Sequence, residues 1–357
     1  MVRFSDVLTI VNGRNQKNVE NKNGQYPIYG SGGIMGYADK YLCEADTVII
    51  GRKGSINNPI YVKEPFWNVD TAFGLVADKT VLLPKYLYYF CVKFDFNALN
   101  TTVTIPSLTK ANLLNIEMVL PTIEEQTIVV NSLDKIVNII DMRKQQLQKL
   151  DELVKARFVE LMDSATLSDE TTIGEVTEQV KVGFVGACEK YYTDESGVPM
   201  LRTGNITDRG IDFKDLKFVT REFHEKNRKS QIHTGDLLIA RHGSNGQANV
   251  YSGIEEAQCL NAVVIVPNKG VASSVFLAGL INSSIVKEQI EKTLVGSTQR
   301  VINTKSIANL KVRIPNINIQ RQYEEFVNQI NKSKLSVQKS LDKLEILKKV
   351  LMQKYFG

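Results

Sequence analysis

Two stretches decide the architecture of this chain: Leu120–Gln126, which reads LPTIEEQ, and Ile314–Gln320, which reads IPNINIQ. An offset of 194 residues superposes Pro121 on Pro315 and Gln126 on Gln320. The same offset holds without a gap from Thr104 on Thr298 to Met162 on Phe356. Self-similarity at a fixed distance is the signature of repeated structural units. The sequence therefore predicts two copies of one unit.

The tail of each copy follows a heptad pattern, with seam residues spaced alternately by three and four. Each seam also holds basic residues, Arg143 and Arg157 in the first copy and Lys334 and Lys348 in the second. The heptad pattern predicts one long helix in each tail, and a single such helix cannot bury its seam alone. We therefore expect the two helices of the chain to pack on each other as an antiparallel coiled coil. A coiled coil between chains is the alternative. The apolar seam positions are Leu133, Ile136, Ile140, Leu147, Leu150, Val154, Val327, Ile330, Val337, Leu341, Leu344 and Leu351.

Start signals place the beginning of each helix. Thr122 follows Pro121, and Glu125 lies three residues on, which is the pattern of a capping box. Asn316 is the capping candidate of the second copy. The pair Glu124-Glu125 suits the positive end of the helix dipole, so we interpret it as structural and not catalytic. The predicted helical spacers are residues 122–162 and 316–357.

The segments before the spacers, residues 1–121 and 163–315, are predicted to be compact α/β domains. Short apolar runs predict buried strands, and glycine and asparagine clusters between them predict turns. The expected strands are 47–50, 72–76, 237–240 and 262–266, and the expected short helices are 86–94 and 275–282. The fold class is thus mixed α/β (α+β), with two globular domains, two long helices and a pseudo-two-fold internal repeat.

Composition excludes several classes. Hydrophobic residues make up 43% and charged residues 23%, as in ordinary soluble globular proteins. No apolar run is long enough for a membrane helix, and we expect no signal peptide. The four cysteines have no C-x-x-C pair, which indicates buried reduced thiols in a cytoplasmic protein. The three histidines match no zinc spacing, so we expect no metal. A net charge of +5 is compatible with a polyanion partner but does not prove one.

Polar and basic residues collect in the glycine-rich turns of both domains. Such side chains read base edges and bind phosphates. Composition alone favours the plainer reading that these are solvated turns. Trp67 could stack on a base, but the run Pro65-Phe66-Trp67 favours packing. The candidate DNA-binding residues are Ser31, Arg52, Lys53, Ser55, Arg202, Thr203, Asn205, Arg241, His242, Ser244, Gln299 and Arg300.

Catalytic motifs are missing. Gly30–Gly33 lacks the lysine of a phosphate loop, and no G-x-S-x-G or H-E-x-x-H occurs. Asn57–Ile60 lacks the second proline and the aromatic residue of the N-P-P-[YF] signature of amino-methyltransferases. These observations favour a binding protein without a cofactor over an enzyme.

The order of motifs resembles a known family. The runs Tyr26–Tyr37, Val48–Ser55 and Glu64–Asp70 follow the pattern of target-recognition domains in specificity subunits of bacterial type I restriction-modification enzymes. The second copy is similar to a different subtype of recognition domain, through Leu201–Ile206, Gly235–Arg241 and Val295–Arg300. The resemblance covers essentially the whole chain.

The resemblance implies a function. Two recognition domains, held apart by an antiparallel helix pair, would each read one half of a split, asymmetric site in double-stranded DNA. Two methyltransferase subunits would dock on the helices and methylate an adenine in each half-site, and restriction subunits would join the full complex. The chain itself would do no chemistry. Two competing hypotheses are a fragment of a fused methyltransferase or nuclease, and a coiled-coil scaffold that binds protein only.

Overall fold

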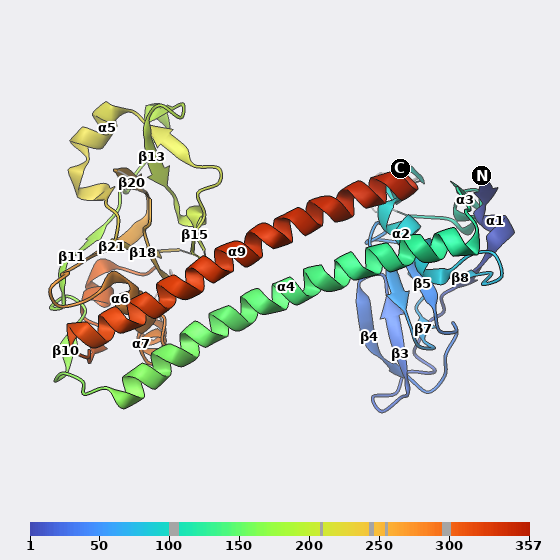
Figure 1. The fold of residues 1–357 in the computed structure, drawn as a ribbon, viewed down its shortest axis with the longest axis horizontal. Helices are drawn as coiled ribbons and strands as arrows, with labels where there is room; N and C mark the ends of the chain where they lie inside the picture. Colours follow the sequence, from blue (N-terminus) through green and yellow to red (C-terminus); the bar gives the residue numbers. More distant parts are fainter. Residues whose placement is uncertain (100–106, 208–209, 243–245, 254–255, 295–300) are drawn as a thin grey trace. The chain divides into compact units, whose positions relative to one another are not determined.

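The computed structural model describes residues 1–99, 107–207, 210–242, 246–253, 256–294 and 301–357. The chain forms two compact units. Unit 1 comprises Met1–Gln145 and Gln338–Gly357, and unit 2 comprises Gln146–Val337. Each unit contains one globular part together with one segment of each long helix, α4 (Ile123–Ser164) and α9 (Ile317–Phe356) (Figure 1). Both long helices expected from the heptad pattern are therefore present.

The helix starts carry the expected caps. The Thr122 backbone N–H donates to Glu125 Oε2 at 3.0 Å, and the Glu125 N–H donates to Thr122 Oγ1 at 3.3 Å, which completes a capping box. At the start of α9, the Ile319 N–H donates to Asn316 Oδ1 at 3.2 Å. The interpretation of Glu125 as a structural residue is confirmed.

The main sheet of unit 1 has four strands in the order β2-β8-β5-β6, and every neighbouring pair is antiparallel. A smaller sheet, β4-β3-β7, pairs β3 with β4 antiparallel and with β7 parallel. The elements are β1 (Val2–Arg3), α1 (Phe4–Val7), β2 (Leu8–Asn12), β3 (Tyr26–Gly30), β4 (Gly33–Ala38), β5 (Thr47–Gly51), β6 (Ile60–Val62), β7 (Trp67–Asn68), β8 (Ala72–Ala77), α2 (Pro84–Lys93), η1 (Phe96–Leu99), α3 (Lys110–Leu114) and β9 (Glu117–Met118).

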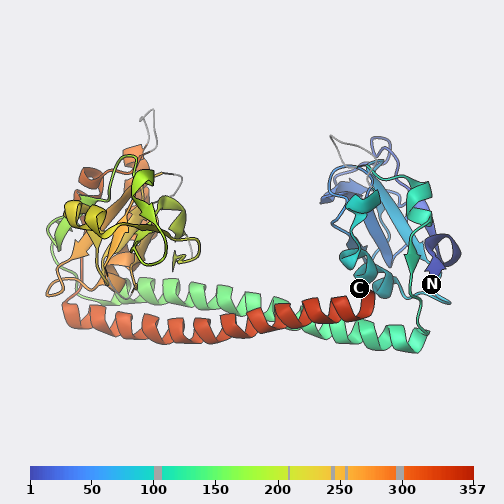
Figure 2. The ribbon, with the colours of Figure 1, turned by 90° about the horizontal axis from the view of Figure 1, so that it is seen from above.

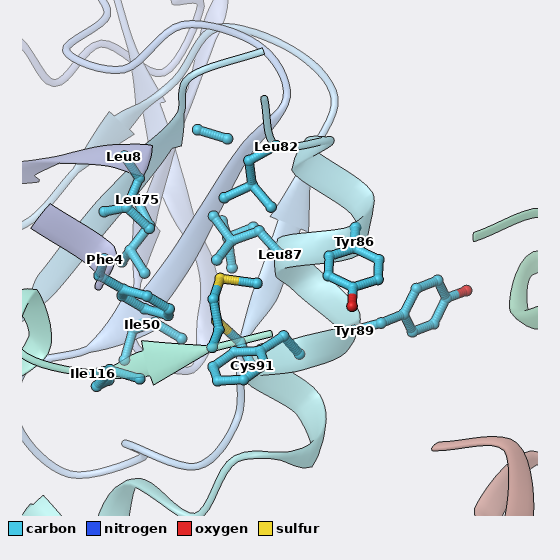
Figure 3. Packing of buried hydrophobic residues seen from close by; sticks show 14 of the residues in the cluster. Phe4, Leu8, Ile50, Leu75, Leu82, Tyr86, Leu87, Tyr89, Cys91 and Ile116 are labelled. Atoms are coloured by element: carbon cyan, nitrogen blue, oxygen red, sulfur yellow. The ribbon is translucent and has the colours of Figure 1, made fainter. Parts of the chain in front are cut away.

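The core of unit 1 lies between the main sheet and helix α2. Ile50 and Leu75 of the sheet face Tyr86 and Leu87 of α2, with Phe4 beside them (Figure 3). The long helices close this core: Val129, Val130 and Leu133 of α4 and Met352 of α9 belong to the same cluster. Full burial of each large side chain contributes about 1.5–3 kcal/mol. The helix segments are therefore part of the domain's core.

Unit 2 repeats the main sheet in the order β11-β21-β18-β19, again antiparallel throughout. Its second sheet is larger, with the order β12-β16-β13-β20-β17. The elements are β10 (Thr171–Thr172), β11 (Thr177–Val182), η2 (Glu189–Tyr191), β12 (Tyr192–Thr193), β13 (Val198–Leu201), η3 (Thr203–Asn205), β14 (Ile206–Thr207), β15 (Gly210–Ile211), β16 (Lys217–Val219), α5 (Arg221–Lys226), η4 (Arg228–Ser230), β17 (Gln231–Ile232), β18 (Leu237–Ala240), β19 (Ala248–Val250), β20 (Ala257–Cys259), β21 (Ala262–Pro267), α6 (Ser274–Ile281), α7 (Ser284–Leu294), α8 (Thr304–Ala308) and β22 (Lys311–Val312).

The core of unit 2 follows the same plan. Helix α6 packs on the main sheet, and Phe158 of α4 and Tyr323 of α9 join the cluster. The Phe158 ring centroid lies 5.6 Å from that of Phe276 and 5.4 Å from that of Tyr323. Phe158 and Met352 differ by the repeat offset of 194, and both are buried. The far end of one long helix thus seals each domain in the same way.

Two buried glutamines show the repeat in atomic detail. The Gln126 side chain accepts from Leu83 N and donates to the carbonyls of Val81 and Pro121. Gln320 makes the equivalent bonds to Ser273 N, Val271 O and Pro315 O. Both side chains are fully buried. Each glutamine ties the start of a long helix to the loop before the core helix α2 or α6, and the predicted repeat is confirmed in both copies.

The sheets also correct one detail of the alignment. The runs Asp46–Ser55 and Asp236–Ser244 are similar in sequence, with one residue less in the second copy, and their first residues suggest that Asp46 matches Asp236. Pairing with β8 and β21 instead aligns Gly51 with Ala240. Thr47 is therefore the equivalent of Asp236, and the extra residue of the first copy precedes β5. This register still aligns Arg52 with Arg241. The predicted strands and short helices all form, with boundaries that differ by a residue or two.

The seam positions of the long helices are sheltered from solvent. Leu133, Ile136, Ile140, Val327, Val337 and Leu341 are buried, and the six other predicted seam residues are half-buried. In unit 1, Lys144 of α4 pairs with Glu345 of α9 at 3.4 Å; in unit 2, Lys334 of α9 pairs with Asp151 of α4. In the second view, the strands of unit 2 lie on one side of its two helix segments (Figure 2).

Other expectations concern membranes, metals and cysteines. No described helix is long and apolar enough to cross a membrane. Among the described residues, no group of three histidine, cysteine or acidic side chains could hold a metal ion. All four cysteines are buried free thiols. Burial raises the pKa of the Cys43 and Cys259 thiols to about 12, so these thiols stay protonated and unreactive.

Candidate nucleic-acid interface

In the first domain, the loop after β5 presents three of the predicted residues. Arg52, Lys53 and Ser55 are all exposed. The Arg52 N–H donates to Thr71 O at 2.7 Å, and the Leu108 N–H donates to Arg52 O at 2.9 Å. The loop is therefore fixed at its backbone while its polar side chains stay free to reach a partner.

Ser31 joins this loop from the turn between β3 and β4. Gly51 is the point of contact, because a Cβ built there would lie 3.0 Å from Ser31 Cβ and 2.5 Å from Ser55 O. The Arg52 guanidinium lies over the Phe73 ring, 5.7 Å from its centroid. This cation–π contact orients the arginine without neutralising it. The fold thus brings the four predicted residues of domain 1 into one patch.

In the second domain, the turn Arg202–Asn205 is built from side-chain bonds to the backbone. Asn205 Oδ1 accepts from Arg202 N at 2.9 Å, and its amide group donates to the carbonyls of Asp212 and Lys214. Arg202 donates to Asp215 O at 3.0 Å. Asn205 is only 5% exposed, so we interpret it as the residue that holds this turn in shape. Arg202 and Thr203 are half-buried and lie at the surface of the turn.

Arg241 follows β18 just as Arg52 follows β5. The Ile302 N–H donates to Arg241 O at 3.1 Å, which is the equivalent of the Leu108–Arg52 bond. Arg241 Nε also donates to Ile302 O at 3.2 Å, and the side chain is half-buried. His242, next along the chain, is exposed. The predicted residues Ser244, Gln299 and Arg300 lie outside the described residues.

The two groups of domain 2 meet at the turn before β21. Thr203 Oγ1 donates to Asn261 O at 3.4 Å. Asn261 precedes Ala262, which pairs with Ala240, the residue before Arg241. Asn261 has a φ of 52°, a left-handed conformation that asparagine tolerates better than most residues. Sequence reasoning missed this turn and the Phe73 support of Arg52, because neither carries a motif.

Trp67 is packed, as its neighbours suggested. It is 8% exposed, and its indole N–H donates to Arg14 O at 2.9 Å. The candidate surface therefore consists of arginine, lysine and small hydroxyl side chains on loops that the backbone fixes. Such a surface can bind phosphates and base edges.

The fold defines a class of architecture: two related α/β domains and two long helices. The family model of the type I restriction modification DNA specificity domain matches residues 1–152 and 170–346. The chain belongs to this family and is a type I restriction-modification specificity subunit. The relatives that it resembles are themselves named as specificity subunits of type I restriction enzymes.

Individual relatives agree with this assignment. The chain is 19% identical to the EcoBI specificity subunit of Escherichia coli, over 89% of this chain and 73% of that one. It is 23% identical to the MjaVIII specificity subunit of Methanocaldococcus jannaschii, over 99% and 90%. Among solved structures, the specificity subunit of M. genitalium matches with a TM-score of 0.68 at 16% identity, covering 100% of this chain and 95% of that one. A chain from a study of type I complex assembly matches with a TM-score of 0.55 at 15% identity, over 99% and 96%.

Proposed function

We propose that each domain of this specificity subunit reads one half of a bipartite, asymmetric target in double-stranded DNA. One observation carries the proposal. Arg52 and Arg241 occupy equivalent positions after equivalent strands, and each accepts a backbone bond from the equivalent residue, Leu108 or Ile302. Arginine is the side chain that most often reads guanine in the major groove. The surroundings of the two arginines differ, as two different half-sites require.

The helices set the distance between the half-sites in this proposal. Contacts of α4 with α9 in each unit, and the sheltered seam, support one antiparallel coiled coil along both helices. Asp151 and Glu345 are equivalent under the repeat, and each pairs with a lysine of the other helix. Domains about one DNA turn apart, roughly 34 Å, would face the same side of the duplex.

The chemistry is assigned to partners. Two methyltransferase subunits dock on the helices, flip an adenine out of each half-site and methylate it. Restriction subunits join the full complex, which acts on DNA in the cytoplasm. The candidate surface of this chain offers arginine, lysine and hydroxyl groups for binding, which supports a recognition role.

Mapping of adenine methylation tests the proposal. This chain is co-expressed with the methyltransferase gene of its own system, and a strain lacking the chain serves as the control. A split motif with one methylated adenine on each strand is expected only when the chain is present. Chain-independent methylation, or none from an assembled complex, would contradict the proposal and favour a protein-binding scaffold.

A further inference from the structure

The two units differ where the core helix of the domain, α2 or α6, meets the long helix, although the repeat relates these elements to each other. In unit 1, a polar aromatic cluster fills the angle between α2, β6 and α4. Lys85 forms an ion pair with Asp134 of α4, and Tyr89 OH donates to the other oxygen of that carboxylate at 2.7 Å. The Tyr88 ring lies 5.3 Å from that of Tyr89 and 5.9 Å from that of Tyr61. We call these five residues the unit 1 cluster. They hold the domain of unit 1 against helix α4.

The equivalent positions in unit 2 follow from the shared anchors. The glutamine bonds align Leu83 with Ser273, so α2 and α6 correspond residue by residue. Sheet pairing aligns β6 with β19, and the repeat offset aligns α4 with α9. Tyr61, Lys85, Tyr88, Tyr89 and Asp134 thus correspond to Val250, Val275, Ala278, Gly279 and Asn328. Every member of the unit 1 cluster is replaced by a smaller or uncharged residue.

All five replacements line a single groove of about 1460 Å³ in unit 2. Its floor is apolar, with Val154, Phe158 and Met162 of α4 and Val327 of α9. Two apolar side chains at its rim are strongly exposed, Val159 at 57% and Ile285 at 70%. Small-molecule sites usually measure about 300–1,000 Å³. The groove is larger than that and open, as expected for a segment of protein.

The charges of the groove favour an apolar occupant. Lys334 pairs with Asp151, and Lys311 pairs with Glu170, so these rim charges already satisfy one another. The position of Asp134, the anion of unit 1, is the neutral Asn328. A nearly balanced rim around an apolar floor does not attract a polyanion such as DNA. It matches an apolar segment that carries an aromatic side chain, because three aromatic rings, those of Tyr61, Tyr88 and Tyr89, occupy the equivalent place in unit 1.

We propose that this groove, formed by α4, α6, α7, α9 and β19, binds an apolar, aromatic-bearing segment of one methyltransferase subunit. The inference rests on the proposed function and goes beyond it, because it makes the two docking positions unequal. The methyltransferase subunit that docks at unit 2 gains a contact with the groove. In unit 1, the side chains of the unit 1 cluster occupy the equivalent place.

Filling the groove with the residues of unit 1 tests the proposal. The variant carries Val250→Tyr, Val275→Lys, Ala278→Tyr and Asn328→Asp. Gly279 is left unchanged, because a Cβ there would lie 2.9 Å from Phe158 Cδ2 and 3.0 Å from Tyr323 OH. The control is Val271→Tyr, at a residue 39% exposed that does not line the groove. Binding of purified methyltransferase subunit is measured by titration and native mass spectrometry.

We expect the filled variant to bind one of two subunits at least about tenfold more weakly, which is 1.4 kcal/mol or more, while the control binds like the wild type. Equal binding of both subunits by a folded filled variant would overturn the inference. Failure of the wild-type chain to bind any methyltransferase subunit would instead refute the proposed function.

If the filled variant does not fold, crosslinking tests whether the methyltransferase subunit binds at the groove. Since the four natural cysteines are buried, Ile285→Cys gives one accessible thiol at the rim for a benzophenone label. In the assembled complex, the label is expected to capture the methyltransferase subunit, whereas a label on Val271→Cys is not. Capture of DNA instead, or of no partner in an assembled complex, would overturn the inference.

Discussion

Arg52 and Arg241 share a backbone position but not an environment. The Arg52 guanidinium rests on the Phe73 ring and is exposed, whereas Arg241 is half-buried and bonds to Ile302 O. Two side chains held differently at the same place can present different groups to DNA. A repeated scaffold can therefore recognise an asymmetric target.

Substitution of these arginines is expected to alter one half of the target at a time. Arg241→Ala should relax selectivity in the half-site of domain 2 by about 1–3 kcal/mol if the side chain contacts a base, and Arg52→Ala should do so in the half-site of domain 1. Methylation mapping of each variant measures this. A uniform loss of binding on every sequence, with a smaller salt dependence, would identify a phosphate contact.

Arg241→Lys separates the two roles further. Lysine keeps the charge but lacks the bidentate fork of arginine. A base contact is lost in this variant, whereas a phosphate contact is largely kept.

Gln126 and Gln320 are expected to matter for stability more than for DNA binding. Each fully buried amide satisfies three backbone groups. Since each buried group left unpaired costs about 1–3 kcal/mol, Gln320→Ala should lower the free energy of unfolding by at least about 2 kcal/mol. Urea unfolding measures the loss. Gln322→Ala, at an exposed position on the same helix, should change it by less than about 0.5 kcal/mol, and an equal effect would refute the interpretation.

His224 makes unit 2 sensitive to acid. Its side chain is 3% exposed, and its ring lies 3.2 Å from Gln258 Nε2 and 3.4 Å from Glu256 Oε2. Burial lowers the pKa of His224 below 6.5, and Glu256 opposes this only in part. Below pH 6.5, His224 therefore binds a proton more readily in the unfolded chain than in the folded chain. The free energy of unfolding is fully maintained above pH 6.5 and decreases as the pH falls below that value.

The pH dependence can be measured by urea unfolding at pH 7.5 and 5.5. The decrease in the free energy of unfolding from pH 7.5 to pH 5.5 is expected to be smaller in His224→Gln than in the wild type. It should persist in His233→Gln, where the ring is 64% exposed. A drop that is unchanged in His224→Gln would show that other groups cause it.

Among the long helices and strands, sequence patterns predicted what depends on local periodicity. The heptad seams, the caps at Thr122 and Asn316, and the apolar strands beside Ile50 and Ile239 all lie where expected. The second sheets were not predicted, because most of their strands have only two to four residues, too few to show an alternating pattern. The difference between them, three strands in unit 1 and five in unit 2, has no periodic signal.

The candidate site was predictable only as a set of residue types. Glycine-rich turns identified Arg52 and Arg241, but the contact of Ser31 with the Gly51 loop depends on tertiary packing. The buried role of Asn205 likewise depends on carbonyls of Asp212 and Lys214 that only the fold brings near.

The helix seam is expected to contribute strongly to stability. Leu133 of α4 is fully buried in the core of unit 1. Leu133→Ala should therefore lower the free energy of unfolding, measured in urea, by about 2–5 kcal/mol. Leu153→Ala, on the same helix at 46% exposure, should cost less than about 0.5 kcal/mol. Similar costs at both positions would show that the seam is not the buried face.

For the whole molecule, we propose two interchangeable recognition modules that share a common helical frame. Each unit seals its core with the far end of one helix, through Met352 or Phe158, so a domain is expected to function only when both helices are present. Residues 163–315 are proposed to form the second module, between the two helical spacers.

Exchange of this module tests the central claim most directly. Residues 163–315 are replaced by the corresponding segment of a relative with a different target, and adenine methylation is mapped after co-expression with the methyltransferase. We expect a new split motif in which one half is replaced while the other half and the spacer length stay the same. Changes in both halves, or an unaltered motif, would contradict it.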